Sequence, residues 1–149
     1  MKAIVCTKYG SPDVLQLQEV DKPAPKDDEV LIRVHAASIN FRDLRLMRAN
    51  PPFVRLMKGG LLRPSQPILG TDVAGRVEAV GGAVRQYQPG DEVFGCLSRY
   101  GGGTFAEYVC AGEDEIALMP ANVSFEQAAA VPLAALTALQ GLRDKGNIQ

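Results

Sequence analysis

The stretch Ile-Leu-Gly-Thr-Asp-Val-Ala-Gly-Arg-Val-Glu-Ala-Val at residues 68–80 decides the fold. Its β-branched residues, Ile68, Thr71, Val73, Val77 and Val80, predict a β-strand. Gly70 and Gly75 stand inside this pattern, where a side chain would obstruct a bulge or a close backbone approach. We therefore expect residues 68–80 to form a strand with a bulge or a close backbone approach at its glycines.

Similar short extended segments lie on both sides of this stretch, separated by turn residues. The alternation is clearest before it, where Val30, Ile32 and Val34 share one face and Arg33 and His35 share the other. Many short strands with regular turns predict a mainly β fold, either a barrel or a sandwich. The expected strands cover residues 2–7, 14–19, 29–37, 68–80, 91–96 and 104–111.

Helical signals are confined to short segments. Asn40 and the acid Asp43 predict a capped helix through residue 47, and residues 53–58 predict a further helical turn. Ser124 and Gln127 form a second capping-box pattern. Pro132 then divides the helical region, so we expect a last helix over residues 133–145, with Gly146 just beyond its end.

The chain has the size and composition of one globular domain. Its 149 residues include 46% hydrophobic and 22% charged residues, and the net charge is -1. Scattered basic residues argue against a nucleic-acid partner. The apolar stretch 128–139 is shorter than the roughly 20 residues of a membrane span, and the N-terminus lacks a signal-peptide pattern. We expect a cytoplasmic protein that does not bind membranes.

Common ligand-binding motifs are absent from the sequence. The glycines of residues 70–75 lack the Lys-Ser/Thr of a phosphate loop, and no G-x-G-x-x-G follows an expected strand. The chain alone is therefore expected to bind NAD(P)H weakly at best. Cys6, Cys96 and Cys110 fit neither a disulfide framework nor a zinc knuckle, and His35 has no nucleophile motif to serve. We expect buried thiols and a structural histidine.

Four segments together resemble the medium-chain dehydrogenase/reductase superfamily. They are Ser-Ile-Asn-Phe-Arg-Asp at 38–43, residues 69–77, Gln-Pro-Gly-Asp-Glu-Val at 88–93, and Ala-Ala-Ala-Val-Pro-Leu at 128–133 with Thr137-Ala138-Leu139. Each segment alone is weak evidence, but the set is specific in its order and spacing. The resemblance implies a GroES-like β-barrel over residues 1–123. Residues 124–149 would be connecting helices toward a nucleotide-binding Rossmann domain that lies outside this sequence.

The branch of the superfamily follows from the positions of the zinc ligands. Zinc alcohol dehydrogenases have a Cys at the position of Asn40, a His at that of Thr71 and a Cys near that of Leu133. Only the acid is kept, as Asp72, and the structural zinc lobe near residues 96–105 is replaced by a Gly-rich turn. The sequence is thus similar to the zinc-free quinone oxidoreductases. It departs from them at Arg45, where that branch usually has a Tyr.

The resemblance implies hydride transfer from NADPH, or NADH, to a quinone, an enone or an aldehyde without zinc. Fixed hydrogen-bond donors must then meet the negative charge that develops on the acceptor oxygen. The implied catalytic residues are Asn40, Arg45 and Tyr100, with Arg42 as a further candidate donor. Asn40 and Thr137 are expected to contact the cofactor, and Asp43 to act as a structural cap. Without the nucleotide-binding domain, the chain is expected to be inactive.

Two alternatives to this function stay open at the level of the sequence. One is a GroES-like binding or structural module without catalysis, because the same fold serves non-enzymes. The other is a zinc-type alcohol dehydrogenase with atypical ligands. The sequence also leaves open a homodimer, the identity of the small-molecule substrate and the choice between NADH and NADPH.

Overall fold

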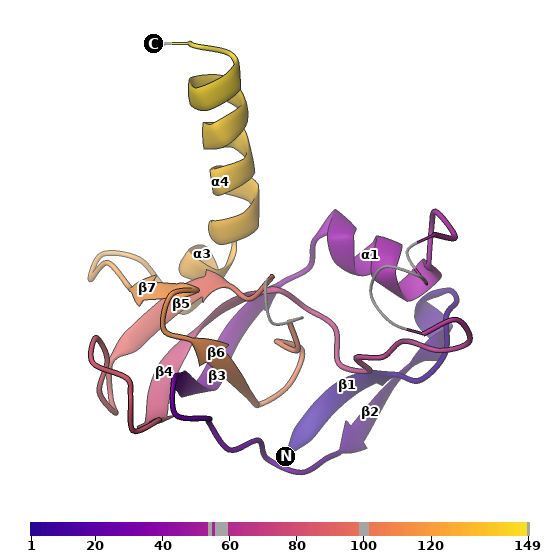
Figure 1. Ribbon diagram of the computed structural model, residues 1–149, viewed down its shortest axis with the longest axis horizontal. Coiled ribbons are helices and arrows are strands. Elements are labelled where there is room, and N and C mark those ends of the chain that lie inside the picture. The colour runs from indigo at the N-terminus through magenta and orange to yellow at the C-terminus, as the bar shows by residue number, and fades with distance from the viewer. Residues whose placement is uncertain (54, 56–59, 99–101, 149) are drawn as a thin grey trace.

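The computed structural model describes residues 1–53, 55, 60–98 and 102–148 as a mainly β structure with short helices (Figure 1). A 3₁₀ turn, Pro12–Val14, precedes the second strand, and a π-helical turn, Gln140–Lys145, follows the last helix. The strands are β1 Lys2–Cys6, β2 Leu15–Glu19, β3 Glu29–Ser38, β4 Asp72–Val80, β5 Glu92–Cys96, β6 Tyr108–Gly112 and β7 Ile116–Leu118, and the helices are α1 Phe41–Arg48, α3 Phe125–Ala129 and α4 Pro132–Leu139.

The strands form two antiparallel sheets. One contains β1 and β2, and the other has the order β6-β3-β4-β5-β7. Single bridges from Ala3 to Ala106 and from Val5 to Ile68 join β1 to segments that flank the larger sheet. The expected mainly β fold is confirmed. The hydrogen-bonded ladders of the described residues nevertheless stay two separate sheets and do not close into one continuous barrel.

The main hydrophobic core lies on the central strands of the larger sheet. Side chains from β3, β4, β5 and β6 meet in it, including Val30, Ile32, Val73, Val93 and Val109. The expected alternation in β3 is confirmed at Arg33 and His35, which are exposed. Leu31 departs from it and is buried, because β3 is an inner strand between β4 and β6.

Helix α3 covers part of the larger sheet through small residues. Ala128 and Ala129 pack against Ala74 of β4, and their small side chains allow a close approach. Ser124 caps this helix by accepting a hydrogen bond from the backbone N–H of Gln127, as the sequence predicts. His35 stacks on Phe125 with ring centroids 4.3 Å apart, so this histidine has the expected structural role.

Strand β4 is shorter than the sequence indicates. It begins at Asp72 rather than at residue 68, because Gly70 has φ of +93° and turns the chain before the ladder starts. The prediction of a close backbone approach at Gly75 is confirmed. A Cβ atom built there would lie 2.2 Å from the carbonyl oxygen of Arg33 on β3.

Several other boundaries differ from those expected. Strand β6 begins at Tyr108 rather than at residue 104, and β7 was not predicted because it has only three residues. The helical turn expected at 53–58 lies mostly outside the described residues. The last helix runs as α4 and then widens into the π-helical turn, and its end has Asn147, not Gly146, in the left-handed conformation.

Helix α4 extends away from both sheets (Figure 1). Pro132 lies in its first turn, where a missing N–H costs nothing. The large apolar side chains of Leu136, Leu139 and Leu142 are 51%, 44% and 56% exposed. Within the described ranges, no helix combines the length and the apolar character that crossing a bilayer requires.

Replacing Gly75 by Ala should destabilise the fold. Because the new methyl group would meet backbone atoms of β3, two strands would have to move apart, and we expect a loss of about 1–3 kcal/mol in the free energy of unfolding. Chemical denaturation measures this loss. The control is Gly82→Ala, since a Cβ at Gly82 has no heavy atom within 4 Å. Equal stability of the two variants would contradict the predicted close approach.

Candidate active site

The candidate site lies where β3 ends and β4 begins. Ser38, the last residue of β3, is paired with Asp72, the first residue of β4. Two residues after Ser38, Asn40 adopts an extended conformation and caps α1. This arrangement places the polar segment 38–43 beside the buried start of β4.

The side-chain amide of Asn40 is held by hydrogen bonds. Its Nδ2 donates to Ser38 Oγ at 3.1 Å and to Asp72 Oδ2 at 3.2 Å. Since an amide nitrogen carries two hydrogens, both are used within the protein. The carbonyl oxygen of the half-buried Asn40 side chain is therefore the group that this residue can offer to a ligand.

Asp72 is the centre of this network. Asp72 has no exposed surface. Its Oδ2 also accepts hydrogen bonds from Ser38 Oγ at 3.1 Å and from the backbone N–H of Leu133 at 3.2 Å. Positions 40, 72 and 133, which hold zinc ligands or their neighbours in the zinc branch, thus come together here. Two of them present N–H donors to the carboxylate, whereas a metal ion needs converging electron-pair donors.

Asp43 has the structural role that the sequence predicts for it. It forms a capping box with Asn40, and its Oδ2 accepts from the backbone N–H of Asn40 at 2.8 Å. The residue is 3% exposed, and this burial raises the pKa of its carboxyl above the ordinary value of 3.8. The backbone N–H groups of Asn40 and Gly70 and the charge of Arg42 oppose the rise, while the negative charge of Asp72 adds to it.

Cys96 pairs with Asp72 in the β4–β5 ladder. Burial, followed by interaction with the Asp72 carboxylate, raises the pKa of the Cys96 thiol from 9.0 to about 11. The thiol is therefore protonated at neutral pH, which makes it a poor nucleophile. In the part of the chain that the structure describes, no three His, Cys, Asp or Glu side chains are grouped as a metal site.

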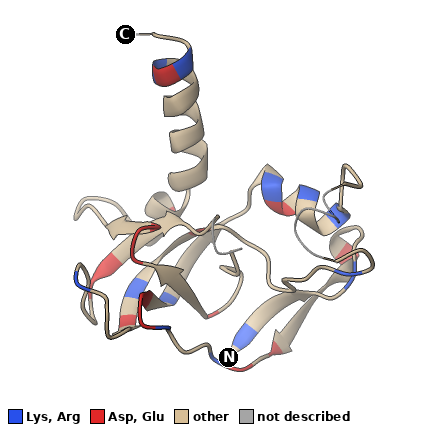
Figure 2. Ribbon diagram, in the orientation of Figure 1, with Lys and Arg blue, Asp and Glu red and all other residues tan. Residues whose placement is uncertain are grey.

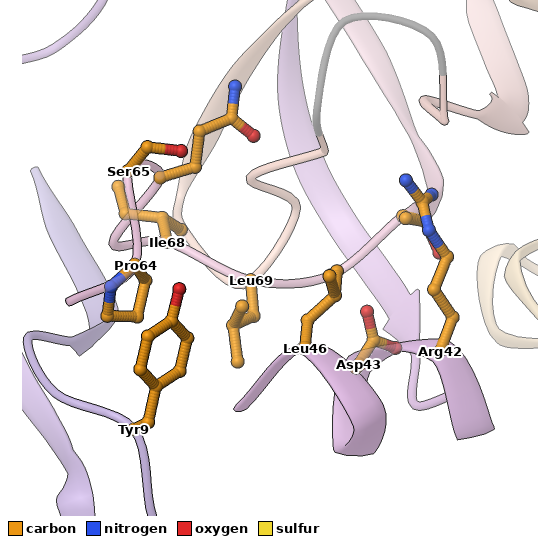
Figure 3. A pocket seen from close by; sticks show the side chains of 11 residues that line it. Tyr9, Arg42, Asp43, Leu46, Pro64, Ser65, Ile68 and Leu69 are labelled. Carbon is orange, nitrogen blue, oxygen red and sulfur yellow. The ribbon is translucent and has the colours of Figure 1, made fainter. Parts of the chain in front are cut away.

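A small cavity lies between α1 and the segment before β4 (Figure 3). Its volume is about 40 Å³, enough for roughly two or three water molecules. Arg42, Asp43 and Thr71 line it, and each has a buried polar atom without a hydrogen-bond partner among the described residues: Nη1, Oδ1 and Oγ1. Such atoms need a water or a ligand to compensate for their burial.

Three arginines, Arg42, Arg45 and Arg48, give α1 all of its positive charge (Figure 2). The Nε of Arg45, the predicted catalytic arginine, donates to the carbonyl oxygen of Asn50 beyond the C-terminal end of the helix, at 3.2 Å. Arg42, in the first turn, donates from Nη2 to the carbonyl oxygen of Ser98 at 3.3 Å. Its charge partly opposes the rise that burial causes in the pKa values of Asp43 and Cys96. The structure thus brings Arg42, rather than Arg45, beside the Asn40 network.

The other predicted residues are Thr137 and Tyr100. The Thr137 hydroxyl donates to the carbonyl oxygen of Leu133, one turn earlier in α4, at 2.6 Å. It lies exposed in an open groove of about 1060 Å³ between α4 and the β5–β7 edge, which Cys96 and Ser98 also line. This groove is large enough for a cofactor-sized ligand. Tyr100 lies outside the described residues.

Sequence reasoning underrated two of these residues. The sequence indicates Asp72 only as the acid kept from the zinc branch, because its long-range partners leave no local signal. Arg42 was only a further candidate. Its signal was its place in the first turn of α1, next to the cap and therefore close to the start of β4.

The family model of the alcohol dehydrogenase GroES-like domain matches residues 26–121. The chain therefore belongs to this family, and its relatives and structural neighbours place it in the medium-chain dehydrogenase/reductase superfamily.

Its similar proteins include a chloroplastic quinone-oxidoreductase homolog of Spinacia oleracea. The two are 40% identical, and the match covers 100% of this chain and 44% of the relative. A 2-methylene-furan-3-one reductase of Solanum lycopersicum is also 40% identical, with 98% and 38% covered. The structure of Escherichia coli quinone oxidoreductase complexed with NADPH superposes with a TM-score of 0.82, at 35% identity, covering 96% of this chain and 40% of that one. The chain thus spans less than half the length of these proteins.

The buried carboxyl of Asp43 should make stability depend on pH. Because its folded-state pKa is raised, the folded state binds its proton more tightly than the unfolded state does. Stability is then greatest below the ordinary pKa of 3.8 and falls as the pH rises through the raised value. Asp43→Asn removes this dependence but keeps an oxygen that can accept from Asn40.

Denaturation of both proteins between pH 3 and 7 tests this expectation. We expect the wild type to lose stability relative to Asp43→Asn over this range as the pH increases. Asp28→Asn, at an exposed site, is the matched control and should follow the wild type. A wild type that gains stability over Asp43→Asn with rising pH would show that the carboxylate is favoured rather than penalised by its surroundings.

Proposed function

We propose that this chain is the substrate-side part of an NAD(P)H-dependent oxidoreductase that reduces a quinone, an enone or an aldehyde without zinc. Residues 1–123 would form the substrate-side domain, and residues 124–149 would lead to a nucleotide-binding domain. The observation that carries the proposal is the Asn40 amide, which the buried Asp72 holds at the start of α1, next to α4 and its groove. The relatives named for quinone and furanone reduction support it.

We propose a site without zinc because of the chemistry of the groups at positions 40, 71, 72 and 133. The Asn40 and Leu133 N–H groups donate to Oδ2 of Asp72, whereas its buried Oδ1 has no hydrogen-bond partner among the described residues. Thr71, at the other ligand position, has a hydroxyl that is 1% exposed and is a weak zinc ligand. These groups fit a metal-free site better than a zinc site.

The residues present fit NADPH on one side of the site. NADPH would supply the hydride when bound, and the similar Escherichia coli enzyme was solved with it. The Thr137 hydroxyl is exposed in the groove and can accept a hydrogen bond while it donates to Leu133. The carbonyl oxygen of Asn40 can accept from a hydroxyl or carboxamide of the cofactor. Both residues would thereby fix the position of the nicotinamide.

The acceptor oxygen needs a donor when it becomes negatively charged. Arg42 is better placed for this role than Arg45, because its Nη1 is buried and has no partner among the described residues. A permanently charged guanidinium with an unused N–H group is a strong hydrogen-bond donor. Tyr100 stays a candidate from the sequence alone. The cytoplasmic location and the homodimer likewise remain predictions.

A chimeric protein tests the function. Residues 1–149 would replace the matching segment of the Escherichia coli quinone oxidoreductase, which brings its own nucleotide-binding domain. We expect the chimera to oxidise NADPH with a small quinone or enone, and the 149-residue chain alone to show no turnover, because half of the cleft is missing. A folded chimera that binds NADPH but reduces none of the three acceptor classes would favour a binding module without catalysis.

The two arginines provide a matched pair within this chimera. Arg42→Ala should lower kcat by about 10²–10³, because one donor to the developing negative charge is lost. Arg45→Ala should change kcat by less than about threefold, since exposed substitutions away from the chemistry have small effects. Steady-state kinetics at saturating NADPH measures both. The reverse ranking would return the catalytic role to Arg45.

A further inference from the structure

The buried carboxylate of Asp72 receives its hydrogen bonds at one oxygen, Oδ2. A carboxylate without contact with water is unstable unless donors surround it. Three donors reach Oδ2: the Ser38 hydroxyl, the Asn40 amide and the Leu133 backbone N–H. The first two belong to the segment between β3 and α1, and the third to α4. The Oδ2 atom of Asp72 therefore joins two segments that are far apart in the sequence, since about 90 residues separate Asn40 from Leu133.

This contact determines how the Asn40 amide is oriented. The two ends of an amide group have nearly the same shape, so packing alone distinguishes them poorly. The negatively charged Asp72 attracts the NH₂ end, and Ser38 Oγ accepts its second hydrogen. The carbonyl end must then point away from Asp72. The capping box, in which the Asn40 side chain accepts from the backbone N–H of Asp43, favours the same orientation, and the carboxylate adds the attraction of a full negative charge.

The same contact completes the first turn of α4. The first backbone N–H groups of a helix lack partners within the helix and are usually capped by a nearby side chain. The N-cap residue of α4 is Val131, which has no side-chain cap hydrogen bond. Asp72 accepts from Leu133 in this turn, and its negative charge also suits the positive end of the helix dipole. A residue of β4 thus caps α4.

We propose that Asp72 is a positioning residue that couples α4 to the Asn40 amide. A single carboxylate oxygen sets both the direction of the Asn40 carbonyl and the start of the helix that carries Thr137. The two groups assigned to the cofactor side, the Asn40 carbonyl and the Thr137 hydroxyl, are therefore aligned by one residue. The catalytic meaning of this alignment rests on the proposed function, but the alignment itself does not.

Nuclear magnetic resonance of the 149-residue chain, labelled with ¹⁵N at Asn and Leu, tests the coupling. In the wild type, the Asn40 side-chain hydrogens should exchange with solvent at least about tenfold more slowly than those of the exposed Asn122 and Asn147. In Asp72→Asn and Asp72→Ala, the Asn40 side-chain signals should shift. The Asn40 side-chain and Leu133 backbone hydrogens should both exchange at least about tenfold faster.

Two control variants separate positioning from stability. Ser124→Ala removes the cap of α3 and lowers stability by a comparable route, yet it should leave the Asn40 signals in place. Thr71→Val changes the buried neighbour of Asp72 and should alter both exchange rates by less than about twofold.

The proposal is overturned if the Asn40 and Leu133 hydrogens keep their protection in a folded Asp72 variant, or if only one of the two responds. Should neither variant fold, the wild-type comparison decides, and unprotected Asn40 hydrogens would overturn it. Because this experiment needs no turnover, its outcome is independent of the chimera test.

Discussion

The arrangement of the candidate site depends on one buried negative charge, the carboxylate of Asp72. Asp72 begins β4 with no exposed surface, so its carboxylate requires hydrogen-bond donors from the protein. The donors come from the end of β3, the cap of α1 and the first turn of α4. The polar groups of the candidate site are ordered by this requirement. Among the described residues, one hydroxyl and two N–H groups donate to this carboxylate.

The surroundings of this charge divide into two sides. On the α1 side, burial raises the pKa of Asp43, and Arg42 offers a buried guanidinium nitrogen beside a small cavity (Figure 3). On the α4 side, a large open groove is bordered by exposed leucines and by Thr137. A reducing enzyme needs both features, because a compact polar site must meet the acceptor while a wider groove holds the cofactor.

The sequence predicted local features well where the chemistry is local. The capping boxes at Asn40 and Ser124 and the position of Pro132 each depend on a few neighbouring residues, and the structure contains all three. Errors arose where distant contacts decide. Strand β4 starts late because Gly70 turns the chain, and three-residue β7 exists only because β5 offers it an edge.

The sequence by itself determined the mainly β fold, because strand alternation and turn residues act over short distances. Its motifs also carried the resemblance to the family, and that resemblance is the basis for predicting Asn40 as a site residue. Only the tertiary structure decided what Asn40 can offer to a ligand, which arginine lies beside it and what caps α4. These depend on hydrogen bonds such as those from Asn40 and Leu133 to Asp72, whose partners are 32 and 61 residues apart. No local pattern encodes such contacts, since they form only when the sheet brings distant segments together.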